Sequence, residues 1–252
     1  MERLSAVIIA KDEVDRIEAA IRSVAFCDEV VVLDSGSTDG TAELAEALGA
    51  RVLRTDWPGF VAQKTRATAA AAHDWVLSID CDERVPAELA REIMELRSAA
   101  PGPVAYRLSR LSWWMGAPVQ RGAWWPDARV RLFDRRCAAW GGVDPHDEVR
   151  ARGPVGALRT PLHHHPFRDL GEHLQTIDRY SDIAAAAARA QGRRAGPLDV
   201  ALRPLAHLAK ALILKRGLLD GPRGWTLALL GAAHCALKWL RIYEGENFAV
   251  RR

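Results

Sequence analysis

Short apolar runs alternate with helix-like segments along the first hundred residues. Each run is rich in Val, Ile and Leu, which is typical of parallel strands that are buried on both faces. Strands are predicted over 4–9, 29–34, 51–54 and 75–80. Between them, helices are predicted over 13–24, 41–48 and 60–72, with a further helix opening at Pro86. This alternation predicts an α/β fold whose mostly parallel sheet is flanked by helices on both faces.

Beyond residue 101 the pattern changes. Strands are predicted over 104–108 and 130–133, and the segment between them is rich in Trp, Gly and Pro. Helical spacing then continues toward the C-terminus, over 170–190, 198–212 and 225–243. Because proline removes a hydrogen bond inside a helix, Pro204 is expected to kink or restart the second of these helices. We therefore expect a catalytic domain over 1–168 and a helical C-terminal region over 169–252.

Composition is that of a folded protein from a reducing compartment. The 252 residues correspond to one or two domains, and 49% hydrophobic with 27% charged residues exclude wholesale disorder. The four cysteines form no CxxC pair, which argues against a disulfide framework or a cysteine-built zinc site. No secretory signal is expected, and the longest uncharged C-terminal run has 14 residues where a membrane span needs about 18. We therefore expect a cytoplasmic location.

Charge is unevenly distributed, although the formal net charge is only +3. Residues 190–252 carry 11 Lys and Arg against 4 Asp and Glu, whereas residues 1–189 carry 24 against 28. Basic helices with Leu- and Trp-rich faces are typical of a surface that binds anionic membranes. The same apolar faces would also suit packing against the catalytic domain. Nucleic acid is not an expected partner, because the basic residues are not interleaved with a known reader motif.

An Asp-x-Asp triplet, Asp80-Cys81-Asp82, follows the predicted fourth strand directly. Two such carboxylates can hold Mg²⁺ or Mn²⁺, with phosphate oxygens and water completing the coordination. In parallel sheets ligands bind beyond the carboxyl ends of the strands, and Asp34 ends another predicted strand there. The triplet alone also fits a solvated acidic loop. Its place in the strand–helix series favours a metal site.

Three segments carry a resemblance to a known family: 4–13, 31–41 (VVLDSGSTDGT) and 75–83 (WVLSIDCDE). They resemble family 2 glycosyltransferases, which have the GT-A fold and use nucleotide-sugar donors. The chain is most similar to the lipopolysaccharide-core glucosyltransferase-like branch, through Trp57-Pro58-Gly59-Phe60, Gln63-Lys64, 124–133, Asp220-Gly221 and Gly224. The resemblance spans nearly the whole chain. It implies a Rossmann-like GT-A domain with a C-terminal helical extension.

The resemblance also assigns the donor side of the site. Many relatives have two aspartates at this position, whereas here Asp34 would be the only aspartate that contacts the nucleotide base. Lys64 would offset the diphosphate charge, although a solvated helix residue is the alternative. Asp82 would ligate the metal directly, and Asp80 would act through the ribose or a metal-bound water. The base pocket would be completed by residues after the first strand: Lys11, Asp12 and Glu13.

For the chemistry, the resemblance implies an inverting transfer, in which a carboxylate beside a histidine takes the proton of the acceptor hydroxyl. Asp147 is the expected base because it follows His146, and Glu148 is its rival. Three consecutive histidines occupy 163–165, but neighbours on an extended chain point to opposite sides and cannot all face one ion. Only His164, which matches the single histidine of the family, is expected near the diphosphate or its metal.

Acceptor binding is expected in the Trp-rich segment. Sugars pack their C–H faces on indole rings, and arginines bind the phosphate or carboxylate groups of an anionic glycolipid. As an alternative, at least two of the tryptophans in this segment belong to the core. The expected acceptor-binding residues are Trp124, Trp125, Arg129 and Arg131.

The leading hypothesis is an inverting, metal-dependent glycosyltransferase that moves a sugar from a nucleotide-sugar donor to a lipid-linked saccharide such as lipopolysaccharide core. We expect it to be peripheral on the cytoplasmic face of the inner membrane. A nucleotidyltransferase acting on a sugar phosphate is one alternative, but the loop after the first strand lacks the glycines that it needs. A non-enzymatic, basic membrane-surface adaptor is the other, and Asp80, Asp82 and Asp147 argue against it.

Overall fold

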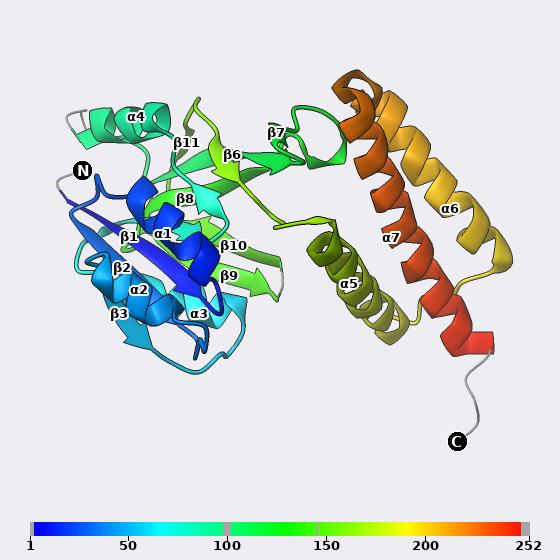
Figure 1. Cartoon of the computed structure of the whole chain (residues 1–252), viewed down its shortest axis with the longest axis horizontal. Helices are drawn as coiled ribbons and strands as arrows, with labels where there is room; N and C mark the ends of the chain where they lie inside the picture. Colours follow the sequence, from blue (N-terminus) through cyan, green and yellow to red (C-terminus); the bar gives the residue numbers. More distant parts are fainter. Residues whose placement is uncertain (1–2, 98–101, 145, 248–252) are drawn as a thin grey trace. The chain divides into compact units, whose positions relative to one another are not determined.

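The computed structural model describes residues 3–97, 102–144 and 146–247, and the chain divides into two units that Figure 1 traces from end to end. We name them the sheet unit and the helical unit. The sheet unit comprises Met1–Leu111 and Asp127–His164, and the helical unit comprises Ser112–Pro126 and His165–Arg252.

Parallel strands form the first part of the sheet. β1 (Leu4–Ala10) lies between β2 (Glu29–Asp34) and β4 (Trp75–Asp80), and β3 (Arg51–Arg54) extends the sheet beyond β2. β1 pairs with β2 so that Ala10 lies opposite Asp34, and with β4 so that Ile9 lies opposite Asp80. The carboxyl ends of β2 and β4 therefore flank the end of β1, at the edge where parallel sheets bind ligands.

The sheet continues with antiparallel pairs. β4 pairs with β8 (Ala128–Asp134), and β8 pairs with β6 (Ala105–Trp114). β9 (Ala138–Val143) and β10 (His146–Ala151) form a separate antiparallel pair that the sequence did not predict. The shorter strands are β5 (Glu83–Arg84), β7 (Ala117–Pro118), β11 (Val155–Ala157) and β12 (Leu162–His164).

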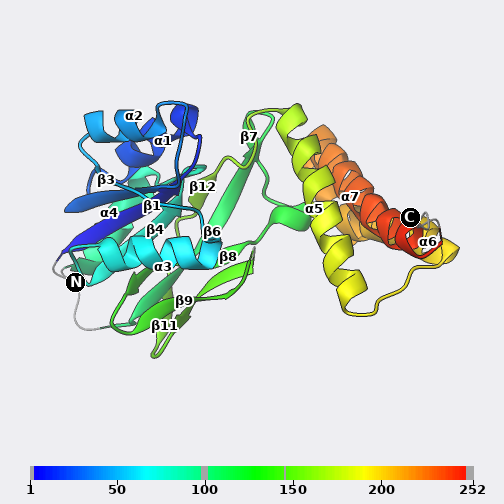
Figure 2. The same ribbon diagram turned by 90° about the horizontal axis from the view of Figure 1, so that it is seen from below.

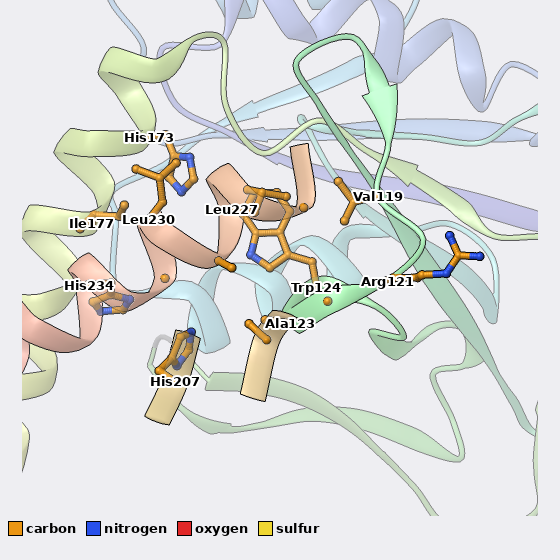
Figure 3. Close-up of a pocket in the computed structure, with 15 residues that line it drawn as sticks. Val119, Arg121, Ala123, Trp124, His173, Ile177, His207, Leu227, Leu230 and His234 are labelled. Carbon is orange, nitrogen blue, oxygen red and sulfur yellow. The ribbon is translucent and has the colours of Figure 1, made fainter. Parts of the chain in front are cut away.

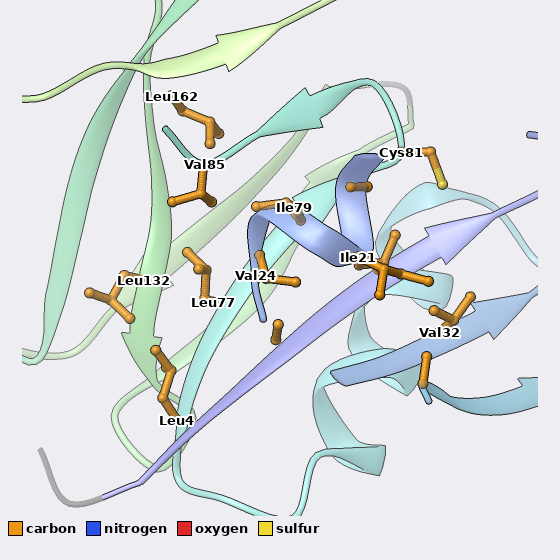
Figure 4. Packing of buried hydrophobic residues seen from close by; sticks show 14 of the residues in the cluster. Leu4, Ile21, Val24, Val32, Leu77, Ile79, Cys81, Val85, Leu132 and Leu162 are labelled. Atoms are coloured by element: carbon orange, nitrogen blue, oxygen red, sulfur yellow. The ribbon is translucent and has the colours of Figure 1, made fainter. Parts of the chain in front are cut away.

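Alternation along the strands builds a core on each face of the sheet. Leu4, Ala6 and Ile8 point to one face, which α1 (Val14–Ser23), α2 (Thr41–Ala47) and α4 (Ala87–Arg97) help to cover. Figure 4 shows part of this cluster, including Leu77 and Ile79 of β4. Val7 points to the other face, where α3 (Phe60–Ala70) and β9 contribute buried side chains. Figure 2 shows α1 and α2 on one side of the sheet and α3 with β9 on the other.

Three long helices dominate the helical unit. α5 (Leu170–Ala190) begins at Asp169, whose side chain accepts a hydrogen bond from the Glu172 amide and so caps the helix. α5 and α6 (Pro197–Ala209) pack against α7 (Gly221–Asn247). The buried residues between them are Ala185, Ala188, Ala195, Trp239 and Ile242. Short helical turns complete the unit: η1 (Gly122–Trp124), η2 (Lys210–Leu214) and η3 (Gly217–Asp220).

The expected fold class is confirmed, with a Rossmann-like parallel sheet, flanking helices and a helical C-terminal extension. Both α6 and α7 begin earlier than predicted, and α7 begins at Gly221. α6 begins at Pro197, because proline at the first helical position lacks only an amide that has no helical partner anyway. The helix continues through Pro204, so the expected restart there is wrong. The Trp-rich segment Ser112–Pro126, expected within 1–168, groups with the helical unit, and the break between His164 and His165 lies close to the expected boundary. In the part of the chain described, no helix is both long and apolar enough to span a bilayer.

Candidate active site

Two loops at the carboxyl edge of the sheet are joined by side-chain hydrogen bonds. Asp12, in the loop after β1, donates its amide to the Ser37 hydroxyl at 2.9 Å and accepts the Thr38 amide at 2.8 Å. Asp39 accepts the Val14 amide at 3.0 Å and the Thr41 amide at 3.0 Å. It therefore satisfies the first amides of both α1 and α2, which lack partners inside their helices.

Asp34 shapes the loop after β2. The residue is buried, and its carboxylate accepts hydrogen bonds from the amides of Gly36 and Ser37, each at 3.0 Å. The Ser37 hydroxyl donates to the other carboxylate oxygen. Lys11 and Asp12 are exposed at the tip of the neighbouring loop and Glu13 is half-buried. The four residues expected around the nucleotide base are thus brought to one edge of the sheet, and their contact with the base stays a prediction.

Lys64 joins two carboxylates that come from distant parts of the sequence. Its Nζ atom donates to Asp147 Oδ2 at 2.9 Å and to Asp80 Oδ2 at 3.2 Å. The Lys64 side chain is only 4% exposed, and its ammonium group lies 5.0 Å from the ring centre of Trp140. A solvated position for this lysine is therefore wrong. The structure brings together the residues expected for donor binding and for proton transfer.

A buried ion-pair network holds Asp80 from the other side. Arg131 donates to Asp80 at 2.7 Å and to Glu83 at 2.6 Å, and Glu83 also accepts the Asp80 amide at 3.0 Å. Arg110 lies 3.3 Å from Glu83 and pairs with Asp127. Glu83 is fully buried, so its charge depends on these arginines for compensation. The sequence signal for Glu83 was its position directly after the Asp-x-Asp triplet, but it was given no role.

Asp147 reaches the site because of the pairing of β9 with β10. Successive residues of a strand point to opposite sides, so Asp147 turns toward Lys64 while Glu148 points away and pairs with Arg150 at 2.8 Å. The Asp147 side chain is 14% exposed and the Glu148 side chain 56%. His146 is exposed. This geometry favours Asp147 over its rival as the base, a role that stays a prediction.

Asp144 anchors this strand pair to the helix that carries Lys64. Its carboxylate accepts the amides of Phe60 and Val61 at 3.1 and 2.9 Å, and so binds the N-terminus of α3. Gly59 makes the approach possible, because a Cβ there would come within 2.0 Å of Asp144 Oδ2. Its φ of 107° is a further reason for glycine at this position. The spacing between Lys64 and Asp147 is thus fixed by a helix cap.

Asp82 faces His164, with 3.3 Å between Asp82 Oδ2 and His164 Nε2. The other oxygen, Asp82 Oδ1, is buried and has no hydrogen-bond partner within the described ranges. In the same ranges, no three His, Cys, Asp or Glu side chains form a group that could hold a metal. Mg²⁺ is commonly bound by one or two carboxylates with phosphates and water, so the unpartnered oxygen of Asp82 fits such an ion.

Burial and charge act in opposite directions on the two aspartates. Burial raises the pKa of the Asp80 carboxyl, but the positive charges of Lys64 and Arg131 outweigh it and leave this pKa well below its ordinary value. Burial also raises the pKa of Asp82, and the hydrogen bond with His164 lowers it to below the ordinary value. Both carboxyls are therefore ionised near neutral pH, as ligation of a cation requires.

The four residues expected to bind the acceptor fall into different surroundings. Arg131 is buried against Asp80 and Glu83, so it acts within the ion-pair network. Arg129 lies at the surface of the sheet unit. Its Nε donates to Asp127 at 2.9 Å. Trp124 and Trp125 are half-buried in the helical unit.

Comparison with known proteins finds one matching family model. Residues 5–122 match the family model described as "Glycosyl transferase family 2". These residues form a glycosyltransferase family 2 domain, and the protein is a glycosyltransferase. Its sheet unit has the α/β architecture that the resemblance implied, a sheet flanked by helices.

Relatives that align along nearly the whole chain are described as glycosyltransferases. This glycosyltransferase is 28% identical to the lipopolysaccharide core biosynthesis glycosyltransferase LpsC of Rhizobium meliloti, over 98% of this chain and 94% of that protein. It is 28% identical to an uncharacterized glycosyltransferase of Rickettsia typhi, over 97% of this chain and 88% of that protein. Among solved structures, glucosyl-3-phosphoglycerate synthase of Mycobacterium tuberculosis, in complex with Mn²⁺, UDP and glucosyl-3-phosphoglycerate, matches with a TM-score of 0.37 and 30% identity. That match covers 44% of each chain.

Proposed function

We propose that this glycosyltransferase moves a sugar, with inversion, from a nucleotide-sugar donor to a lipid-linked saccharide of the lipopolysaccharide-core type. The observation that carries the proposal is the position of Lys64 between Asp80 and Asp147. Asp80 belongs to the donor side of the site and Asp147 is the proposed base. The buried ammonium group of Lys64 therefore holds the donor-side carboxylate and the proposed base within hydrogen-bonding distance of one cation.

Proton transfer is the part of the chemistry that we assign to Asp147. In an inverting transfer the acceptor oxygen attacks the anomeric carbon while a base takes its proton, and the bond to the diphosphate breaks on the opposite side. A carboxylate in a largely enclosed position suits this role, because the base must reach the acceptor hydroxyl and the site must exclude competing water. Lys64 orients the carboxylate through its hydrogen bond.

The departing nucleoside diphosphate needs positive charge. Asp82, with its unpartnered Oδ1, is the residue that we propose to hold Mg²⁺ or Mn²⁺, with Asp80 close by. Bound there, such an ion would neutralise the developing charge on the diphosphate. His164 orients Asp82 through its contact at 3.3 Å, which makes it a positioning residue in this proposal.

The acceptor assignment is supported by likeness to LpsC, whose name places it in lipopolysaccharide core biosynthesis. The helical unit supports a lipid-linked acceptor. Large apolar side chains on η2 and η3 are exposed, including Ile213 at 65% and Leu214 at 77%, beside the exposed Lys215 and Arg216. Apolar residues next to basic ones are typical of a surface that rests on anionic lipid. We therefore propose a peripheral location on the cytoplasmic face of the inner membrane.

A thermal-shift screen tests the central claim. The full chain is mixed with UDP, ADP, GDP and their sugar conjugates, each with and without Mn²⁺. A ligand that binds only the folded protein raises the unfolding temperature. We expect one nucleotide class to stabilise wild type and to do so more strongly with Mn²⁺, and Asp82→Asn to lose the metal-dependent part. No shift from any of these compounds would contradict the proposed donor.

A further inference from the structure

A cavity inside the helical unit has no role in the site described so far. It has a volume of about 170 Å³ and lies between η1, α5, α6, η2 and α7. All of its lining residues belong to the helical unit. Figure 3 shows Trp124 with three histidines around it: His173 of α5, His207 of α6 and His234 of α7.

Most of the wall is apolar. Ile177, Leu227 and Leu230 line the cavity together with the indole of Trp124. No acidic side chain lines it. The guanidinium group of Arg121 points away from the histidines in Figure 3. This group pairs with Asp220 at 3.1 Å. A charged ligand would thus find no opposite charge to compensate it. The lining fits a neutral molecule.

Two polar atoms in this wall lack partners. His173 Nδ1 and His234 Nε2 are buried, and neither has a hydrogen-bond partner among the residues that the structure places. His173 itself is only 5% exposed and stacks on Phe167 at 4.0 Å between ring centres. Buried polar atoms without a partner cost free energy, so each such atom calls for a ligand or a water to explain it.

Burial keeps these imidazoles neutral near pH 7. Burial lowers the pKa of His173, His207 and His234. Neighbouring positive charge lowers these pKa values further, from His234 on His173, from Lys210 on His207, and from Lys238 and His207 on His234. A neutral imidazole has one donor and one acceptor nitrogen, and hydroxyl groups can pair with both. The wall therefore offers hydroxyl-binding groups next to an aromatic face.

Size limits the ligand to one ring. A cavity of about 150 Å³ lined by apolar side chains admits a molecule the size of benzene. Gly231 lets α7 approach His207 closely, because any larger residue would place a Cβ within 2.6 Å of His207 Nε2. This close approach narrows the cavity at His207. A six-membered ring with hydroxyl groups is the neutral ligand that matches the volume, the indole and the imidazoles together.

We propose that this cavity is a saccharide subsite that binds one neutral hexose-like unit, with Trp124 against the ring and His173 and His234 on its hydroxyl groups. The assignment rests on the proposed function in one respect, namely that the sugar is a unit of the acceptor saccharide. Binding of the sugar itself requires no donor, no metal and no turnover. Trp124 is then a binding residue of the helical unit.

Ligand-observed NMR on the full chain tests the subsite directly. The probes are methyl glycosides of glucose, galactose and mannose, with inorganic phosphate and octanoate as probes of anionic and acyl ligands. We expect saturation transfer to at least one glycoside and none to phosphate. Binding of octanoate alone would overturn the proposal in favour of a lipid pocket, and no signal from any glycoside would overturn it outright.

Matched variants locate the signal. His173→Phe keeps the ring that stacks on Phe167. His234→Leu removes Nε2, which has no partner among the described residues, together with the hydrogen bond between this histidine and the Tyr180 backbone. We expect each to weaken glycoside binding by roughly threefold to tenfold, the value of one hydrogen bond. Trp225→Leu removes an exposed tryptophan of α7 outside the cavity and should leave binding unchanged. Equal binding by wild type and both histidine variants would overturn the proposal.

Catalysis separates this proposal from the proposed function. Hydrolysis of the nucleotide sugar by water needs only the sheet-unit residues, and acceptor-dependent transfer needs the saccharide as well. His173→Phe should raise the KM for the acceptor and leave donor hydrolysis unchanged. Glycoside binding without any nucleotide-sugar turnover would contradict the proposed function and still support the saccharide subsite. Normal transfer kinetics in both histidine variants would contradict the saccharide subsite but not the proposed function.

Discussion

The ammonium group of Lys64 on α3 lies 2.9 Å from the Asp147 carboxylate on β10, a contact between residues 83 positions apart. Lys64 is also within 3.2 Å of Asp80 at the end of β4. Without this cation the two carboxylates would face each other across a partly buried space and repel. The positive charge of the lysine therefore offsets the repulsion between the proposed base and the carboxylate proposed for donor binding.

Asp147→Asn is the first test of this site. The amide keeps the shape of the side chain but cannot take a proton, so we expect kcat to fall at least about 100-fold while nucleotide binding by thermal shift is retained. Glu148→Gln is the matched control, because Glu148 is exposed and pairs only with Arg150 at the surface. We expect near-normal turnover from it. Near-normal turnover in Asp147→Asn together with inactivity of Glu148→Gln would reverse the assignment.

Lys64→Met removes the bridging charge and keeps much of the side-chain volume. We expect a loss of roughly 2–3 kcal/mol in the free energy of unfolding, less than the about 3–5 for a fully buried pair, since Asp80 keeps Arg131. The pKa of Asp80 should rise toward its ordinary value, because one of the charges that lower it is gone. Stability that depends on ionised Asp80 is then lost at a higher pH during acid unfolding.

Urea unfolding at several pH values measures both effects. Arg66→Ala is the control on the same helix, because Arg66 is exposed and its partner Asp56 lies at the surface. It should change the free energy of unfolding by less than about 0.5 kcal/mol. A Lys64→Met variant as stable and as active as wild type would show that the bridge is incidental.

Metal dependence is expected to follow Asp82 more closely than Asp80. Asp82→Asn exchanges a carboxylate with one unpartnered oxygen for a weaker ligand, and should raise the Mn²⁺ concentration for half-maximal activity by roughly tenfold or more. Activity of wild type after EDTA treatment should return on adding Mn²⁺ or Mg²⁺. Full activity of wild type in EDTA would rule out a resident divalent ion in the reaction.

Strand positions were predictable because buried parallel strands carry continuous apolar runs. β2, β3 and β4 have the predicted bounds, and so does α5 with its Asp169 cap. The β9–β10 pair was not predicted, because its residues are mostly half-buried or exposed and lack such a run. Its pairing depends on the rest of the fold, including the Asp144 contact with α3.

The candidate site was predictable where local motifs carry it. Asp80 and Asp82 could be found because they directly follow a buried strand. The network of Glu83 with Arg110 and Arg131 could not, because it joins residues 27 and 48 positions apart that no local pattern connects. Arg131 illustrates the reason. Its residue type suggested anion binding at a surface, and only the fold shows it buried against Asp80.

Acidification should weaken the helical unit through His173. Burial lowers the pKa of His173 below that of an unfolded chain, so the unfolded state binds a proton that the folded state excludes. Stability is therefore lost as the pH falls below about 6.5, by at most about 1.4 kcal/mol per pH unit for this group. The unfolding temperature of wild type should fall between pH 7 and 5.5, and that of His173→Phe should fall less. Equal slopes for the two proteins would contradict the buried, neutral imidazole.

Membrane binding should depend on the apolar residues of η2 and on the basic residues that follow it. Ile213 and Leu214 are among the most exposed large apolar side chains of the protein, and Lys215 and Arg216 follow them. Replacing both apolar residues with Asp should lower partition to anionic vesicles by at least about tenfold, since each loses burial in lipid and gains a repelling charge. Flotation with vesicles of phosphatidylglycerol measures this, and binding of wild type should weaken as salt screens the basic residues.

Val155→Asp, on an exposed strand of the sheet unit, should bind as wild type does. If wild type stays in solution at low salt, the helical unit does not rest on anionic lipid, and its exposed leucines must have a different partner.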